Sequence, residues 1–301
     1  MIKPPSLKKG DCIGLISTAR KISKEELEPS MKIFDKWGLK VKFASHLFEV
    51  QNQFAGSDEQ RLADLQGFID NPELKAIICV RGGYGTVRII DELNFLSLLS
   101  KPKWVCGFSD VTVLLNKLNS VGIECLHSSM PISFPNNSKE SIESLRKVLF
   151  GEEHIIKIPS NPLNRNGKAR GKVIGGNLSI LYSQLGSPTA FNTEGQILFI
   201  EDLDEYLYHI DRMVYNLKRN SYFEKLAGLI VGGMSSMNDN SVPFGRNAEE
   251  IISDIVRPYN FPVCFGFPAG HVEDNRSLIF GRRANLLVGY EVELEFEHGP
   301  T

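Results

Sequence analysis

The sequence predicts an α/β protein with a parallel sheet in its first half and antiparallel strands at its end. Over residues 11–126, apolar runs of five to seven residues alternate with stretches whose apolar residues recur at helical spacing. This alternation is typical of a parallel sheet covered by helices on both faces. Residues 277–297 differ, because they read as two or three strands joined by glycine-containing turns, which favours an antiparallel element.

The first half contains five predicted strands and four predicted helices. The strands are DCIGLIS, VKFAS, KAIICV, KWVCGF and IECLH. We expect helices from Ser23, from about Ser57, shortly after Gly85 and from Ser109. Two of these starts match a capping box, in which a serine is followed three residues later by Glu or Gln, as in S-K-E-E and S-D-E-Q. Pro29 lies inside the first helical stretch, so we expect that helix to break or kink there.

The second half begins after a change in composition. Residues 151–171 are polar and rich in Pro, Gly and Asn, which indicates a linker between a domain over 1–150 and another over 172–301. Within the second domain, GQILFIEDL and AGLIVGGM are predicted strands, and HIDRMVYNLKRN and AEEIISDIVRPY are predicted helices.

The bulk composition excludes several classes of protein. The 301 residues allow two domains, and 42% hydrophobic with 23% charged residues is ordinary for a soluble globular protein. A formal net charge of −2 gives no electrostatic argument for binding nucleic acid or an anionic membrane. No apolar run approaches the ~20 residues of a membrane span. The five cysteines form no CxxC pair, so we expect reduced, buried thiols in a cytoplasmic protein.

The sequence contains none of the common metal-binding or nucleotide-binding motifs. It has no HExxH and no Cys/His cluster, so we expect no metal. The glycine-rich stretch RGGYG, residues 81–85, is neither a Walker loop nor a complete GxGxxG, so we expect no nucleotide cofactor. The stretch is either a simple turn or a set of backbone N–H groups aimed at a developing oxyanion.

Chemistry in an open α/β sheet gathers at the carboxyl ends of its strands. Three predicted strands end in suitable residues, at Ser17-Thr18, at RGGYG and at Ser109-Asp110. The last of these, in GFSDV, is either a helix N-cap or a nucleophile elbow, a tight strand-to-helix turn that exposes a serine oxygen. Gly107 suits the elbow, whereas Val111 stands where a second glycine is usual.

A serine nucleophile needs a base, and two of the six histidines are suitable. His46 is possible, while His154, His209 and His298 are expected to be solvated. His127 ends a strand of the same sheet as Ser109, and His271 lies in the loop GFPAGHVEDN. The residues alone do not separate these two. Glu201, at the end of ILFIE, is a candidate to orient the base, although a charged loop at a strand end also explains it.

The sequence resembles the LD-carboxypeptidase family of serine peptidases, which includes the microcin C self-immunity peptidases. The matching segments occur in order from about residue 11 to 271 and are IGLIST, FAGSDEQRLADL, AIICVRGGYG, CGFSDVTVLL, VIGGNLS, ILFIEDLDEYLYHIDRM, LAGLIVGGM and FPAGH. The resemblance implies a flavodoxin-like N-terminal domain and a smaller, β-rich C-terminal domain of the swivelling type. It also implies that Ser109 is the nucleophile, His271 its base and Glu201 the residue that orients the base.

The resemblance further implies a substrate and a setting. We expect a cytoplasmic homodimer that cleaves the L,D bond to the terminal D-Ala of murein tetrapeptides during wall recycling, with Gly83 and Asp110 donating backbone N–H groups to the oxyanion. The alternatives are an amidase acting on peptidyl or aminoacyl adenylates and a non-catalytic ligand-binding protein. Where relatives often have His-Gly-Pro, this chain has His127-Ser128-Ser129-Met130-Pro131, so the nearby substrate pocket is expected to differ.

Overall fold

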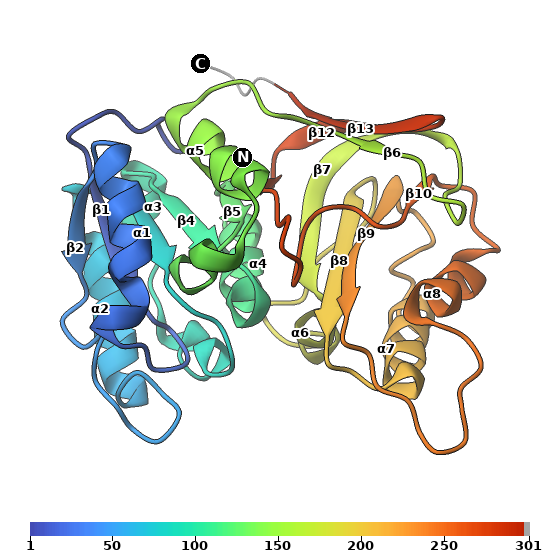
Figure 1. Cartoon of the computed structure of the whole chain (residues 1–301), viewed down its shortest axis with the longest axis horizontal. Helices are drawn as coiled ribbons and strands as arrows, with labels where there is room; N and C mark the ends of the chain where they lie inside the picture. The colour runs from blue at the N-terminus through green and yellow to red at the C-terminus, as the bar shows by residue number, and fades with distance from the viewer. Residues whose placement is uncertain (298–301) are drawn as a thin grey trace. The chain divides into compact units, whose positions relative to one another are not determined.

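The computed structural model describes residues 1–297, which form two compact units (Figure 1). The first unit contains Met1–Glu153 and Glu273–Gly281, and the second contains His154–Val272 and residues 282–297. We expected a linker over 151–171, but strand β6 (Ile155–Pro159) and the start of β7 (Gly167–Asn177) lie within this range. The C-terminal part is also not continuous, since nine of its residues return to the first unit.

The sheet of the first unit has the order β11-β5-β4-β3-β1-β2. The five strands β1 to β5 pair in parallel in the flavodoxin-like order 2-1-3-4-5, which confirms the predicted fold class. Strand β11 pairs antiparallel with β5. The bounds are β1 Cys12–Ile16, β2 Lys40–Phe43, β3 Leu74–Cys79, β4 Trp104–Gly107, β5 Cys125–His127 and β11 Leu278–Phe280.

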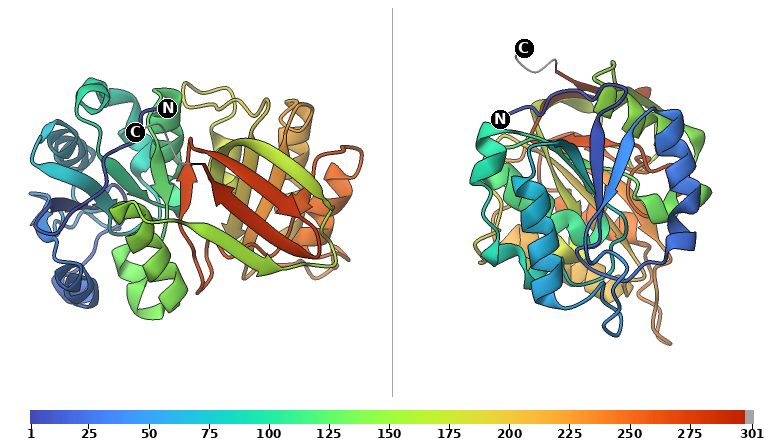
Figure 2. Two further views of the ribbon diagram at one scale, coloured as in Figure 1. Left: turned by 90° about the horizontal axis from the view of Figure 1, so that it is seen from above. Right: turned by 90° about the vertical axis from the view of Figure 1, so that its left-hand side faces the viewer.

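Helices cover both faces of this sheet, and α1 and α2 lie on opposite faces (Figure 2, right). The α-helices are α1 Lys24–Lys36, α2 Asp58–Asp70, α3 Leu96–Ser100, α4 Thr112–Ser120 and α5 Lys139–Phe150. The 3₁₀ helices are η1 Thr86–Arg88, η2 Ile90–Glu92, η3 Ser109–Val111 and η4 Pro131–Asn136. Both predicted capping boxes are present, at the starts of α1 and α2.

Helix α1 continues through Pro29, so the break that was one of our two expectations there is absent. A proline at this position removes one intrahelical hydrogen bond, to the carbonyl of Glu25. The helix nevertheless buries Leu27, Ser30 and Phe34 on one face. Because packing of such a face supplies most of a helix's stability in a protein, it outweighs the single lost bond.

The second unit contains a mixed sheet in the order β10-β9-β8-β7-β12-β13-β6. Strands β7 to β10 are parallel, and β12, β13 and β6 continue the sheet in antiparallel fashion. The predicted antiparallel end is therefore confirmed for β12 and β13, whereas β11 belongs to the other sheet. The remaining bounds are β8 Ile197–Leu203, β9 Gly228–Ser235, β10 Val263–Cys264, β12 Arg283–Val288, β13 Glu291–Phe296, α6 Leu178–Ser183, α7 Leu207–Arg219 and α8 Ala248–Val256.

The core of the second unit lies between this sheet and helices α7 and α8. Met213 and Leu217 of α7 and Ile252 of α8 are fully buried in one cluster with Leu198 of β8 and Val231 of β9. The five cysteines are free thiols, and only Cys12 is not buried. Within residues 1–297, no helix is both long enough and apolar enough to cross a membrane.

Candidate active site

Ser109 occupies a strained corner between β4 and α4. Its φ angle is +63°, a left-handed conformation that residues other than glycine seldom adopt. Neither η3 nor α4 uses it as an N-cap, because Phe108 and Val111 hold those positions. Ser109 is therefore not a helix N-cap. Its left-handed backbone at a strand-to-helix turn is the geometry expected of a nucleophile elbow.

Two glycines make this corner possible. A methyl group on Gly107 would lie 2.9 Å from Cγ1 of Val111, so the turn has no room for a side chain there. A methyl group on Gly82 would lie 3.1 Å from Cβ and 3.2 Å from Oγ of Ser109. The glycine loop that follows β3 is thus packed directly against the serine that follows β4, as expected for neighbouring parallel strands.

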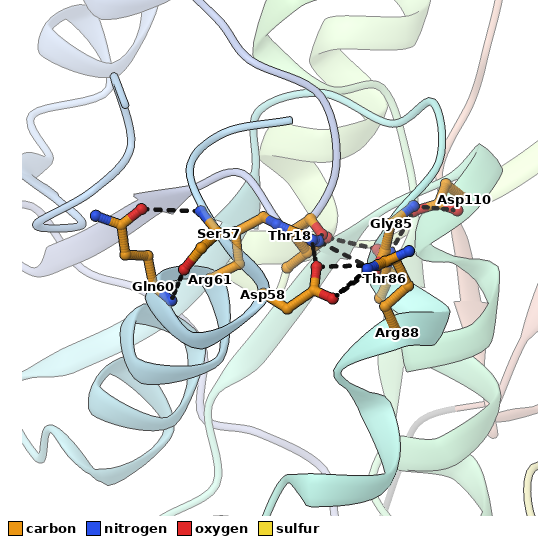
Figure 3. A network of polar contacts seen from close by, with 9 residues as sticks. All are labelled: Thr18, Ser57, Asp58, Gln60, Arg61, Gly85, Thr86, Arg88 and Asp110. Carbon is orange, nitrogen blue, oxygen red and sulfur yellow. Dashed lines mark hydrogen bonds and ion pairs between the residues drawn. The ribbon is translucent and has the colours of Figure 1, made fainter. Parts of the chain in front are cut away.

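The carboxylate of Asp110 is buried beside Ser109 and holds the far end of the glycine loop. It accepts hydrogen bonds from the backbone N–H of Thr86 at 2.9 Å and of Gly85 at 3.3 Å (Figure 3). Burial raises the pKa of Asp110, although the bonds from Thr86 and Gly85 and the charge of Arg61 oppose that rise. Gly83 lies within the same loop at φ +111°, where a β-carbon would overlap the side chain of Arg20.

Glu201 and His271, in the second unit, form a hydrogen-bonded pair. Glu201 is fully buried near the end of β8, and its Oε2 lies 2.6 Å from Nδ1 and 3.2 Å from the backbone N of His271. A carboxylate only accepts hydrogen bonds, so Nδ1 is the donor. In the neutral imidazole this contact sets the tautomer in which Nε2 of His271 carries the lone pair.

Gly270 and a bulge in β9 bring the loop that carries His271 close to β8. Opposite Glu201, β9 advances three residues, from Val231 to Met234, while β8 advances two, which is a bulge. Gly270 adopts φ +103°, and a methyl group there would lie 2.7 Å from Cβ, Cγ and Oε2 of Glu201. Ser235 donates a hydrogen bond of 2.7 Å to the carbonyl of His271 and anchors the loop after the histidine.

Charged groups near His271 raise the pKa of its imidazole. Burial lowers the pKa of His271, but the charge and hydrogen bond of Glu201 together outweigh it, so the pKa is raised above its ordinary 6.5. Burial and the neighbouring Glu201 raise the pKa of Asp202 to about 7, despite a hydrogen bond from Asn177. The negative charge of Glu201 thus stabilises the protonated form of His271.

The other histidines have different surroundings. His127 is fully buried, with the rings of Phe108 and Phe280 at 5.7 and 5.5 Å. His46 and His209 bond through Nδ1 to acidic side chains, and His154 stacks on an aromatic ring, while His298 lies outside the described residues. Only His271 is hydrogen-bonded to Glu201 among the described histidines.

Sequence reasoning missed Arg61, which is fully buried on α2 and bonded to the carbonyls of Thr18 and Gly85. The available signal was its position, because Arg61 shares a helix face with the buried Leu65 and Phe68, at spacings of four and seven residues. A charged residue in an apolar stripe indicates a buried polar contact. Among the described residues, no group of three or more His, Cys, Asp or Glu side chains is arranged to hold a metal ion.

The sequence matches two protein-family models. One is the LD-carboxypeptidase N-terminal domain, over residues 13–128, and the other is the LD-carboxypeptidase C-terminal domain, over residues 170–286. A probable murein peptide carboxypeptidase of Bacillus subtilis is 33% identical over 296 residues, covering 94% of this chain and 91% of the relative.

Solved structures have the same fold. The crystal structure of muramoyltetrapeptide carboxypeptidase from Oxalobacter formigenes superposes with a TM-score of 0.88 at 26% identity, covering 96% of this chain and all of that chain. The protein MccF in complex with glutamyl sulfamoyl guanosine gives a TM-score of 0.87 at 21% identity, with 98% of each chain covered. At that identity the second likeness shows the fold alone.

Proposed function

This chain belongs to the LD-carboxypeptidase family, and we propose that it is a serine-type hydrolase that releases the terminal D-Ala of murein tetrapeptides. The relatives named as murein peptide and muramoyltetrapeptide carboxypeptidases support this substrate class. The observation that carries the serine chemistry is the left-handed conformation of Ser109 at the end of β4. We place the reaction in the cytoplasm, in wall recycling, and propose that the enzyme is a homodimer.

The proposed mechanism uses Ser109, His271 and Glu201 as a triad. Nε2 of His271 takes the proton of Ser109 as Oγ attacks the carbonyl of the scissile bond, and Glu201 stabilises the imidazolium without being protonated. The imidazolium then gives its proton to the nitrogen of D-Ala, which leaves, and an acyl-enzyme remains. Water attacks this ester with His271 again as base, and His271 then returns the proton to Oγ of Ser109 as the ester bond breaks and the shortened peptide departs.

The negative oxygen formed at each attack needs donors. We propose the backbone N–H groups of Gly83 and Asp110, because one lies in the loop packed on Ser109 and the other directly follows it. Removal of one such donor typically costs about 2.7–4 kcal/mol of transition-state stabilisation. Both donors belong to the first unit, as does the serine that they serve.

An amidase acting on peptidyl or aminoacyl adenylates is the second candidate function. The same fold in MccF holds glutamyl sulfamoyl guanosine, which combines an aminoacyl group with a nucleoside. The triad chemistry would be unchanged, and only the leaving group would differ. A ligand-binding protein without covalent chemistry is the third possibility.

One experiment separates these functions. The purified protein is incubated with L-Ala-γ-D-Glu-mDap-D-Ala, with its Lys counterpart and with a peptidyl adenylate, and the products are followed by mass spectrometry. We expect release of D-Ala from a tetrapeptide. Cleavage of the adenylate alone would establish the amidase, and binding of a substrate without any product would establish the binding protein.

Variants test the residue roles in the same assay. Ser109→Ala, Glu201→Ala and His271→Ala are each expected to remove most turnover, and double variants to be little worse than single ones, because a triad acts as a unit. His46→Ala is the matched control, since His46 is also bonded through Nδ1 to a carboxylate, that of Asp64. Near-normal turnover by folded Ser109→Ala would refute serine catalysis.

A further inference from the structure

The peptide group between the glycine loop and η1 is gripped by a buried anion and a buried cation (Figure 3). Asp110 accepts from the N–H of Gly85 and of Thr86. Arg61 donates from Nη1 to the carbonyl of Gly85 at 3.1 Å. Gly85 is therefore held at its N–H by a carboxylate and at its C=O by a guanidinium, which fixes the orientation of both peptide groups that flank it.

Arg61 is itself firmly placed. Its Nη1 also donates to the carbonyl of Thr18 at 2.7 Å, its Nη2 pairs with Asp58, and its guanidinium lies over the ring of Phe54 at 4.9 Å. Thr18 follows β1, Asp58 begins α2 and Gly85 follows β3, so the guanidinium joins the segments after two strands to the start of α2. Gly85 has no room for a side chain here, because a methyl group would lie 2.7 Å from Nη1.

The other end of the glycine loop, at Gly82, packs against Ser109. Gly82 lies three residues before Gly85, and its carbonyl accepts a bond from the backbone N–H of Arg20 at 3.4 Å. A second tie, 2.7 Å between the hydroxyls of Thr18 and Thr86, runs parallel to the Arg61 contact. Both ends of the four-residue segment Gly82–Gly85 are thus anchored, and Gly83 lies between the anchors.

We infer that Asp110 and Arg61 are positioning residues, which together hold the glycine loop at the spacing from Ser109 that oxyanion binding requires. Asp110 then acts twice. Its backbone N–H is one proposed oxyanion donor, and its side chain sets the place of the loop that carries the other. We call the contacts of Asp110 and Arg61 with Gly85 and Thr86 the clamp. Donors that are already in place need no reorganisation in the transition state, so loss of the clamp should lower kcat more than it changes substrate affinity. The inference rests on the proposed function.

The kinetic arm of the test uses Asp110→Asn. The amide keeps the size of the carboxylate, but its NH₂ group faces one of the two backbone donors, so one hydrogen bond is replaced by a repulsive contact. We expect kcat for D-Ala release to fall about 10- to 100-fold, below the loss of a whole donor, while KM changes less than about 3-fold. Asp64→Asn is the control, because Asp64 is also buried and accepts a backbone N–H, that of His46; its kcat should not change.

A structural arm does not depend on turnover. Hydrogen exchange followed by mass spectrometry should show faster exchange over residues 82–86 in Asp110→Asn and not in Asp64→Asn, since one of the Gly85 and Thr86 amides loses its acceptor. Arg61→Lys, which keeps the charge and loses the forked geometry, should give a smaller change in the same direction, and serves if Asp110→Asn does not fold.

The outcomes are distinct. Unaltered exchange over 82–86 in folded variants overturns the clamp, and faster exchange with unchanged kcat overturns its positioning role. Wild-type protein that releases no product from any of the three substrates overturns the proposed function instead, and the exchange result alone then decides the clamp.

Discussion

Gly270→Ala tests how the second unit positions Glu201 against His271, the proposed base. Gly270 precedes His271 and has a φ of +103°. An alanine methyl group would lie 2.7 Å from three atoms of Glu201, namely Cβ, Cγ and Oε2, whereas ordinary contacts begin at 3.4 Å. The side chain of Glu201 or the histidine loop must therefore move by at least about 0.7 Å, and Oε2 is the atom that holds Nδ1 of His271.

The expected magnitude follows from this displacement. A misplacement of about 1 Å in a catalytic arrangement can cost about 100-fold in rate, which is about 2.7 kcal/mol. A left-handed conformation costs an alanine a further ~1–2 kcal/mol of stability. We expect kcat to fall by about 100-fold and the melting temperature to fall by several degrees.

The assay measures kcat, KM and thermal unfolding of Gly270→Ala beside Gly245→Ala. Gly245 also has a positive φ, +83°, in the second unit, but a methyl group there meets nothing within 4 Å. The control therefore has the backbone strain without the contact on Glu201, and should lose stability while keeping kcat. A folded Gly270→Ala enzyme with the kcat of Gly245→Ala would refute the proposed catalytic role of the Glu201–His271 contact.

Four further predictions concern pH, the oxyanion loop, cofactors and stability. Because the base must be neutral and the pKa of His271 is raised, kcat/KM should rise with pH through a value above 6.5, and residual activity of Glu201→Gln should show this limb at lower pH; an unmoved limb would contradict the assignment. Gly83→Val should lower kcat by about 100-fold or more with less change in KM, and a folded variant with normal kcat would show that the loop only grips ligand. Full activity is expected after exhaustive EDTA treatment and without NAD or ATP, so activity lost to chelator and restored by zinc would be contrary evidence. Burial lowers the pKa of Lys103 to about 8, yet its ammonium donates to carbonyls at the end of α2. Lys103→Met should therefore destabilise the protein by about 1–3 kcal/mol in urea unfolding, and an unchanged midpoint would show that these bonds contribute nothing net.

Much of this protein is determined by local sequence. The inner parallel strands β1, β3 and β4 of the first unit are mostly buried, apolar runs, because helices cover both faces of that sheet, and such runs can be recognised from the sequence. The capping boxes at Ser23 and Ser57 were equally legible, since a cap involves residues only three positions apart. The corner at Ser109 was recognisable as well, from an apolar strand that ends in Gly-Phe-Ser-Asp at the start of a helix.

Other features depend on contacts between distant residues, and local pattern does not contain them. Residues 151–171 looked like a linker because they are polar. Strand β6 buries only every second residue, and the first four residues of β7 are not buried. The strands that pair with them, β13 and β12, come more than a hundred residues later. Residues 278–280 looked like part of the same antiparallel end, yet β11 pairs with β5 in the other unit.

The chemistry divides in the same way. Residue types and spacing identified Glu201 as a candidate to orient the base, but they did not distinguish His127 from His271 as that base. The family resemblance favoured His271. The hydrogen bond that joins Glu201 to His271 spans 70 positions and exists because a bulge in β9 and a left-handed Gly270 bring that loop onto β8. The buried Arg61 reaches Thr18 and Gly85 over 43 and 24 positions. Sequence thus determined which side chains can do chemistry, and tertiary structure decided their partners, because a hydrogen bond needs two groups within about 3 Å and only the folded chain sets that distance.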